Sequence, residues 1–173
     1  MMMKCLNLLA VLLFAIIAPM AVAQKAPSNE SAVELEWQDL IPESERARLA
    51  QIQAQLLDHN SGQAEQLLLG DVRPELDGQT VKIPGFVIPL EGDSESITEF
   101  LLVPFYGACI HVPPPPPNQI IHVKFEKGAP TKELWDIVTI TGTLKAESLL
   151  SESIGVESGY AIAGATLESY SKV

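Results

Sequence analysis

The spacing of hydrophobic residues changes along the chain and divides it into three parts. Residues 6–17 form an almost unbroken apolar run. Between residues 42 and 70 apolar positions recur every three or four residues, which is the period of a helix. From about residue 74 onward they alternate with polar positions, which is the period of a β-strand.

The apolar run is typical of a signal peptide. Lys4 gives it a short basic start, and Ala21-Val22-Ala23 fits a small-x-small cleavage site. We therefore expect residues 1–23 to be removed on export to the bacterial periplasm. An uncleaved anchor is the alternative, although the run is short for a transmembrane helix. After cleavage no second long apolar stretch is left, so we expect no transmembrane segment in the mature chain.

The remaining residues predict a short linker and one domain. Residues 24–34 are polar and without periodicity, which indicates a flexible linker. The domain then covers 35–173, with helices within 42–70. A first helix begins near Pro42, and a second short helix spans 63–69. Before them, the amphipathic residues 35–41 are expected to dock Trp37 on the domain.

The β-rich part predicts a barrel. Five segments have the composition and alternation of strands: 79–90, 98–105, 119–126, 135–145 and 159–168. Pro84-Gly85 predicts a bulge, a bend or an edge in the first of them. In the third, Ile121 and Val123 share one face and His122 lies on the other. We predict a mainly β fold: a small OB-like barrel of five or six strands over 74–170, preceded by one or two helices.

Charge narrows the possible partners. The whole chain has 22 acidic against 11 basic residues and a net charge of −11. Nucleic acids and anionic membrane surfaces need a cationic footprint, so the charge argues against both. The chain also lacks a phosphate-binding glycine loop, Gly-x-Ser-x-Gly and His-Glu-x-x-His. This absence favours a non-enzymatic protein without settling the question.

Cys109 and His111 are the residues with the clearest potential for chemistry. Cleavage would remove Cys5, so Cys109 would have no partner for an internal disulfide. In an extended segment Cys109 and His111 point the same way, and a thiolate with an imidazole suits zinc or copper(I). Of the two other histidines, His122 is a better candidate for a third ligand than His59, because the strand of His122 is expected to pair near 98–105 whereas His59 lies at a predicted helix end. The alternatives are an inert buried thiol and a reactive thiol in a redox or enzymatic role.

The connection from 104 to 118 holds five consecutive prolines. Such a run predicts a stiff polyproline II rod about 15 Å long. The rod is either a rigid spacer across one end of the barrel or a docking surface for a protein partner. The candidate interaction residues are Phe105, Tyr106, Pro113, Pro114, Pro115, Pro116, Pro117 and Asn118.

These residues also carry a family resemblance. The string from Gly107-Ala108-Cys109 through His111 and the prolines to Asn118-Gln119 closely resembles the bacterial family catalogued as domain of unknown function 3299. The stretch from Asp77-Gly78 to Glu91 and the final strands fit it as well, so the resemblance covers about 35–170. It implies an exported protein without an established activity.

The resemblance also implies a role. Some family members look to be encoded beside ABC-transporter components and periplasmic metal-binding proteins tied to zinc supply. We therefore expect a non-enzymatic periplasmic accessory module that binds zinc through Cys109, His111 and His122 and works with such partners. The alternative is a protein-interaction module that uses the polyproline segment and no metal.

Overall fold

A computed structural model describes residues 31–56, 66, 70–108, 114–130 and 137–169. The predicted signal peptide and most of the predicted linker lie outside these residues. At the end of the predicted linker, Val33–Glu34 form strand β1, which pairs in parallel with Val81 and Lys82. This part of the predicted linker therefore belongs to the sheet.

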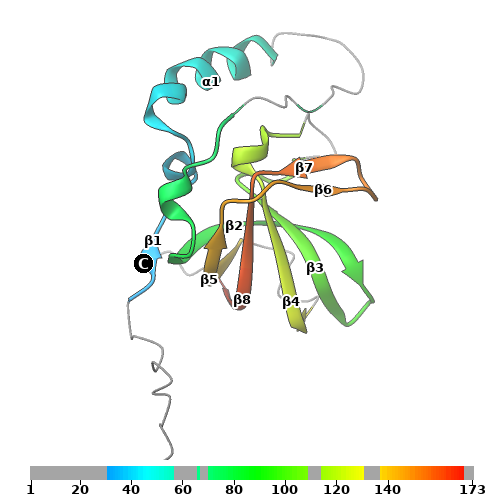
Figure 1. Cartoon of the computed structure of the whole chain (residues 1–173). Helices are drawn as coiled ribbons and strands as arrows, with labels where there is room; N and C mark the ends of the chain where they lie inside the picture. Colours follow the sequence, from blue (N-terminus) through cyan, green and yellow to red (C-terminus); the bar gives the residue numbers. More distant parts are fainter. Residues whose placement is uncertain (1–30, 57–65, 67–69, 109–113, 131–136, 170–173) are drawn as a thin grey trace, which may run out of the picture.

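The fold is a closed barrel of five strands (Figure 1). The strands are β2 (Thr80–Gly92), β3 (Ser96–Val103), β4 (Ile121–Pro130), β5 (Val138–Lys145) and β8 (Tyr160–Ser169). Their order is β2-β3-β4-β8-β5, and pairing of β5 with β2 closes the ring. The β4–β8 pair is parallel and the other pairs of the ring are antiparallel. The predicted mainly β, OB-like barrel is confirmed.

Three short strands lie outside the ring. Besides β1, strands β6 (Leu149–Ser151) and β7 (Val156–Ser158) form an antiparallel hairpin between β5 and β8 in the chain. The hairpin lies across one end of the barrel (Figure 1). Strands of two or three residues are too short to show a clear hydrophobic period, and none of the three was predicted.

Strand β2 closes the barrel because it changes partner in its middle. Thr80–Gly85 pair with β5, whereas Phe86–Gly92 pair with β3. The change falls directly after Pro84-Gly85, where the sequence predicted a bulge, a bend or an edge. The carbonyl oxygen of Pro84 accepts a hydrogen bond of 2.8 Å from Nε1 of Trp37. Trp37 therefore docks on the barrel as predicted.

The interior of the barrel forms the main hydrophobic core. Each strand contributes the residues on one of its faces, as the period of two requires. The buried members on the strands are Val81, Ile83, Ile97, Phe100, Leu102, Ile121, Val123, Ala129, Val138, Ile140, Leu144, Tyr160 and Ile162. Leu35, Leu40 and Leu76, which precede the barrel in the chain, complete the cluster.

Helical structure is limited in the described part of the chain. The predicted first helix is confirmed as α1 (Glu43–Leu56), which lies beyond one end of the barrel (Figure 1). The other helices are single 3-10 turns: η1 (Trp37–Leu40), η2 (Pro74–Leu76) and η3 (Pro117–Gln119). The second helix predicted over 63–69 lies outside the described residues except for Gln66, which is in no helix.

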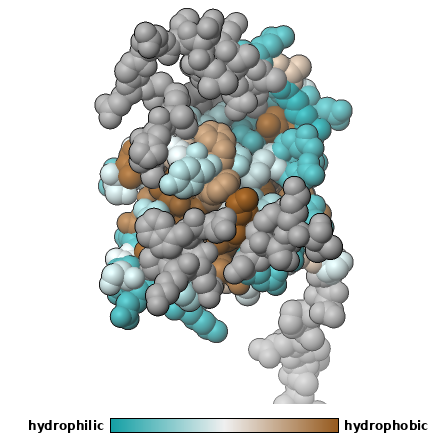
Figure 2. All heavy atoms as spheres, turned by 180° about the vertical axis from the view of Figure 1, so that it is seen from behind, coloured by the Kyte–Doolittle hydropathy of each residue, from teal (hydrophilic) through white to brown (hydrophobic). Residues whose placement is uncertain are grey.

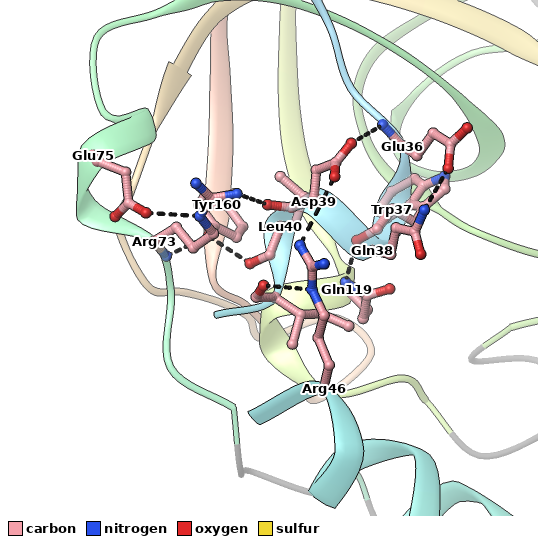
Figure 3. Close-up of polar contacts among 11 residues, drawn as sticks. Glu36, Trp37, Gln38, Asp39, Leu40, Arg46, Arg73, Glu75, Gln119 and Tyr160 are labelled. Carbon is pink, nitrogen blue, oxygen red and sulfur yellow. Dashed lines mark hydrogen bonds and ion pairs between the residues drawn. The ribbon is translucent and has the colours of Figure 1, made fainter. Parts of the chain in front are cut away.

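The phenol of Tyr160 ties the segments before the barrel to strand β8 (Figure 3). Its hydroxyl accepts a hydrogen bond of 2.6 Å from the backbone N–H of Arg73 and donates one of 2.9 Å to the carbonyl of Leu40. The Arg73 guanidinium donates to the carbonyl of Asp39 at 2.7 Å. Burial raises the pKa of Tyr160, since it disfavours the phenolate.

Replacing Tyr160 by phenylalanine is expected to lower the free energy of unfolding by about 1–3 kcal/mol, because it leaves a backbone N–H and a carbonyl without their partner. Urea unfolding measures the loss. Tyr106→Phe is the matched control, since Tyr106 is 77% exposed. Equal effects of the two substitutions would contradict this role of Tyr160.

The same tyrosine predicts a pH dependence. A group whose pKa is raised on folding stabilises the protein below its unfolded pKa and stops doing so as pH rises through the folded value. We therefore expect the wild-type free energy of unfolding to decline above about pH 10. Urea unfolding at rising pH should show a smaller decline for Tyr160→Phe than for Tyr106→Phe. An identical decline would exclude Tyr160 as its source.

Candidate binding site on the outer face of the barrel

Part of the outer face of β3 and β4 is buried under other parts of the chain. A second hydrophobic cluster lies there, formed by Ile88, Leu101, Val103, Ala108, Ile120 and Val156. Val156 comes from the hairpin, and Ala108 comes from the connection that leads into Cys109. This part of the outer face is therefore buried, whereas Lys124 farther along β4 is exposed.

His122 is the buried polar residue of β4 on this face. Ile121 and Val123 point into the barrel, so the alternation of the strand places His122 outside, as predicted. Its register partner on β3 is Leu101, a member of the second cluster. His122 is 8% exposed. A buried imidazole needs a hydrogen-bond partner, because a buried polar group without one costs free energy.

Glu99 supplies that partner. Its Oε1 lies 2.7 Å from Nε2 of His122, and its Oε2 lies 3.8 Å from Nζ of Lys124. The Glu99 side chain is 20% exposed, whereas that of Lys124 is 72% exposed. Solvent screens the pair with Lys124, so the histidine is the stronger partner of this carboxylate.

A recess of about 400 Å³ opens beside the pair. Charged groups and small or aliphatic side chains line it: Glu99, His122, Lys124, Lys145, Glu147, Leu149, Leu150, Ala161, Ile162 and Ala163. The recess lies where β4 and β8 stop pairing, since the pairing of these strands ends at Val123 and Ile162. A small ligand or ion could reach the Glu99–His122 pair from it.

Among the other predicted metal ligands, Cys109 and His111 lie outside the described residues. Ala108, the residue before Cys109, is fully buried in the second hydrophobic cluster. This cluster also contains Leu101, which lies opposite His122 in the pairing of β3 with β4. Within the described ranges no group of three or more His, Cys, Asp or Glu residues could hold a metal ion. The predicted three-ligand site therefore stays a prediction, with His122 as its described member.

The predicted interaction residues divide into an exposed pair and a buried run. Phe105 is 40% and Tyr106 77% exposed, and the Tyr106 ring meets Phe86 edge-on with centroids 6.1 Å apart. Pro115, Pro116, Pro117 and Asn118 are buried and Pro114 is half-buried; Pro113 is not described.

Seen from behind, the molecule carries hydrophobic residues across its middle (Figure 2).

The predicted polyproline rod is shorter than expected. Pro117 is the first residue of η3, a position that suits proline because an N–H there has no partner within the helix. The extended run therefore ends at Pro116. The backbone N–H of Gly159 donates to the Pro117 carbonyl at 2.7 Å, and a Cβ at Gly159 would lie 3.0 Å from the same oxygen. This close approach requires glycine.

Asn118 and Gln119, which follow the prolines, hold the fold together. Asn118 donates to the carbonyl of Asp71 at 3.0 Å. The side chain of Gln119 donates to the carbonyl of Trp37 at 2.9 Å (Figure 3). Asn118 is fully buried, so its role in this structure is internal.

Glu99 was missed by the sequence reasoning. It lies two residues before Leu101 on a predicted strand, and so on the same face as the histidine opposite Leu101. Pairing of the predicted strands 98–105 and 119–126 was expected, but their register was not. A register would have placed Glu99 beside Lys124 and near His122.

The fold and the covered outer face define a small closed β-barrel protein with one candidate binding recess. The family described as Protein of unknown function (DUF3299) matches residues 37–169, and the chain therefore belongs to this family. The chain is also similar to a DUF3299 family protein from Pseudomonas aeruginosa PAO1 whose crystal structure is known. The two are 34% identical, with a TM-score of 0.61 over 82% of this chain and 99% of that one.

No curated protein matches the chain. Across the described ranges, no helix combines the length and the hydrophobicity that a membrane span needs.

Gln66 is expected to hold the proline segment against the hairpin. Its side chain donates to the carbonyls of Pro115 at 3.0 Å and Glu157 at 2.7 Å, and it accepts from the N–H of Glu157 at 2.8 Å. Gln66→Ala should lower the free energy of unfolding by about 1–3 kcal/mol. Urea unfolding provides the measurement. Gln38→Ala is the control, because Gln38 is exposed and bonds only to an exposed side chain.

Proposed function

We propose that this protein is a non-enzymatic binding module of the bacterial periplasm that holds zinc through Cys109, His111 and His122. The observation that carries the proposal is the buried imidazole of His122, bonded through one ring nitrogen to a carboxylate at 2.7 Å. Histidines that ligate metals almost always make such a bond with the ring nitrogen that is not on the metal.

The donor set suits this role. One thiolate and two imidazoles are preferred zinc ligands, and a site with three protein ligands keeps a fourth position open. An open position suits the capture and release of an ion better than a closed structural site does. The net charge of −11 also attracts cations to the surface.

The proposed partners are the components of an ABC transporter or a periplasmic metal-binding protein. Their support is the family resemblance in the sequence, which implies such gene neighbours. In this proposal the module captures zinc, relays it or senses it beside the transporter.

Zinc retention tests the metal proposal directly. The protein, expressed with its own N-terminal segment and purified reduced without chelator or affinity tag, is loaded with zinc and dialysed. We expect about one zinc per chain, lost in Cys109→Ser and in His111→Ala because each removes a ligand. His59→Ala is the matched control and should keep the metal. A folded wild-type protein that retains no zinc would overturn the proposal.

A second candidate function is a protein-interaction module, favoured by the exposure of the Phe105-Tyr106 pair. In this alternative the aromatic pair is the docking surface, because the buried Pro115–Pro117 would first have to leave the barrel. Cross-linking in the producing bacterium would then capture one specific partner with wild type and not with Tyr106→Ser, while zinc content stays the same for both. A partner captured equally by both would exclude this surface.

A further inference from the structure

The recess on the outer face owes its shape to strand β8. Tyr160 and Ile162 point into the barrel core, so the alternation of the strand places Ala161 and Ala163 on the outer face. Both alanines line the recess. Short side chains on this strand, between strands that carry longer ones, leave a hollow with an apolar floor.

Basic side chains lie on both sides of this floor. Ala161 pairs with Lys145 of β5 on one side and with His122 of β4 on the other. The three residues therefore form one row across three strands, and two strand spacings place the Cα atoms of Lys145 and His122 roughly 10 Å apart. Lys124, two residues after His122 on β4, also lines the recess.

Lys145 differs from the other basic residues of the recess in its ionic partners. Glu99 lies beside both His122 and Lys124, whereas Lys145 forms no ion pair with any described residue. This is notable in a chain with 22 acidic and 11 basic residues. Glu147 lines the recess as well, but it is exposed, so solvent screens its charge. The half-buried Lys145 is therefore available to pair with an anion in the recess.

The hairpin adds apolar side chains beside the floor. Leu149 and Leu150 of β6 line the recess, and Leu150 is 62% exposed. An apolar group that covered these side chains and the alanines would be removed from water together with them, which is favourable. The recess thus combines one available cation with an aliphatic lining.

We infer that the recess binds a small aliphatic carboxylate. Its carboxylate pairs with Lys145, and its hydrocarbon chain lies on Ala161 and Ala163 against Leu149 and Leu150. The volume of about 400 Å³ is within the range of about 300–1,000 Å³ found for small-molecule sites. This inference goes beyond the zinc function proposed above and does not require the metal.

Hexanoate is the probe that tests the inference. Zinc-free protein, prepared over a chelating resin, is titrated near neutral pH with hexanoate, hexan-1-ol and hexylammonium while amide ¹H–¹⁵N shifts are followed. We expect hexanoate to move the amides of Ala161 and Ala163 and to bind about 10-fold more tightly than hexan-1-ol, because its hydrogen bond to Lys145 is charge-assisted. Hexylammonium should not bind. Equal affinities for the acid and the alcohol, or no shift of these amides, would overturn the inference.

Lys145→Gln tests the cation. It should lower the affinity for hexanoate about 10-fold, to that of hexan-1-ol, and leave binding of the alcohol unchanged. Lys127→Gln is the matched control, because it removes the same charge from an exposed position of β4 outside the recess. Equal hexanoate affinities for the two variants would exclude Lys145 as the partner of the carboxylate.

Ala163→Leu tests the floor. Ala163 is exposed, so the fold should accept the larger side chain, which fills the space expected for the hydrocarbon chain. Binding of hexanoate and of hexan-1-ol should both be lost. Thr166→Leu, at an exposed position of β8 outside the recess, should bind both as wild type does. Unchanged binding in a folded Ala163→Leu would contradict this placement; if that variant does not fold, the result for Lys145→Gln decides.

Discussion

The closure of the barrel by strand β2 is the constraint on which the remaining structure depends. This one strand pairs with two neighbouring strands. Its residues Thr80–Gly85 pair with β5, and Phe86–Gly92 pair with β3. At the change of partner, a Cβ on Gly85 would lie 2.8 Å from Cγ of Leu102 and 2.9 Å from Cζ2 of Trp37. Glycine at this point therefore leaves room for Leu102 and lets Trp37 dock on the strand. Closure of the barrel and attachment of the segment before it are thus coupled.

A second layer of packing follows from the connections between the strands. The β3–β4 connection contributes the buried prolines, and the β5–β8 connection contributes the hairpin that meets them through Gly159 and Pro117. Ala108 and Val156, which come from these connections, cover part of the outer face of β3 and β4. A recess lies beside the covered part, and the Glu99–His122 pair lines that recess.

The sequence was sufficient for the elements with a clear period. All five barrel strands, helix α1 and the outward direction of His122 followed from alternation and spacing. The sequence was insufficient where tertiary contacts determine the local structure. Strands of two or three residues are too short to show a hydrophobic period. Pro117 begins a 3-10 turn instead of extending the polyproline rod. Placing Glu99 beside His122 required the register of β3 and β4, which alternation alone does not fix.

The energetics of the Glu99–His122 pair favour a functional interpretation over a structural one. Removing two polar side chains from water costs free energy, and their mutual attraction rarely exceeds what well-packed apolar residues of similar size would contribute. On one side of His122 this face carries such residues, Leu101, Val103 and Ile120, so an apolar residue at position 122 would extend their cluster. Local departures from the most stable arrangement are expected where a protein binds or reacts. The pair lines a recess, and Ala108, the residue before Cys109, packs on the same face of the barrel.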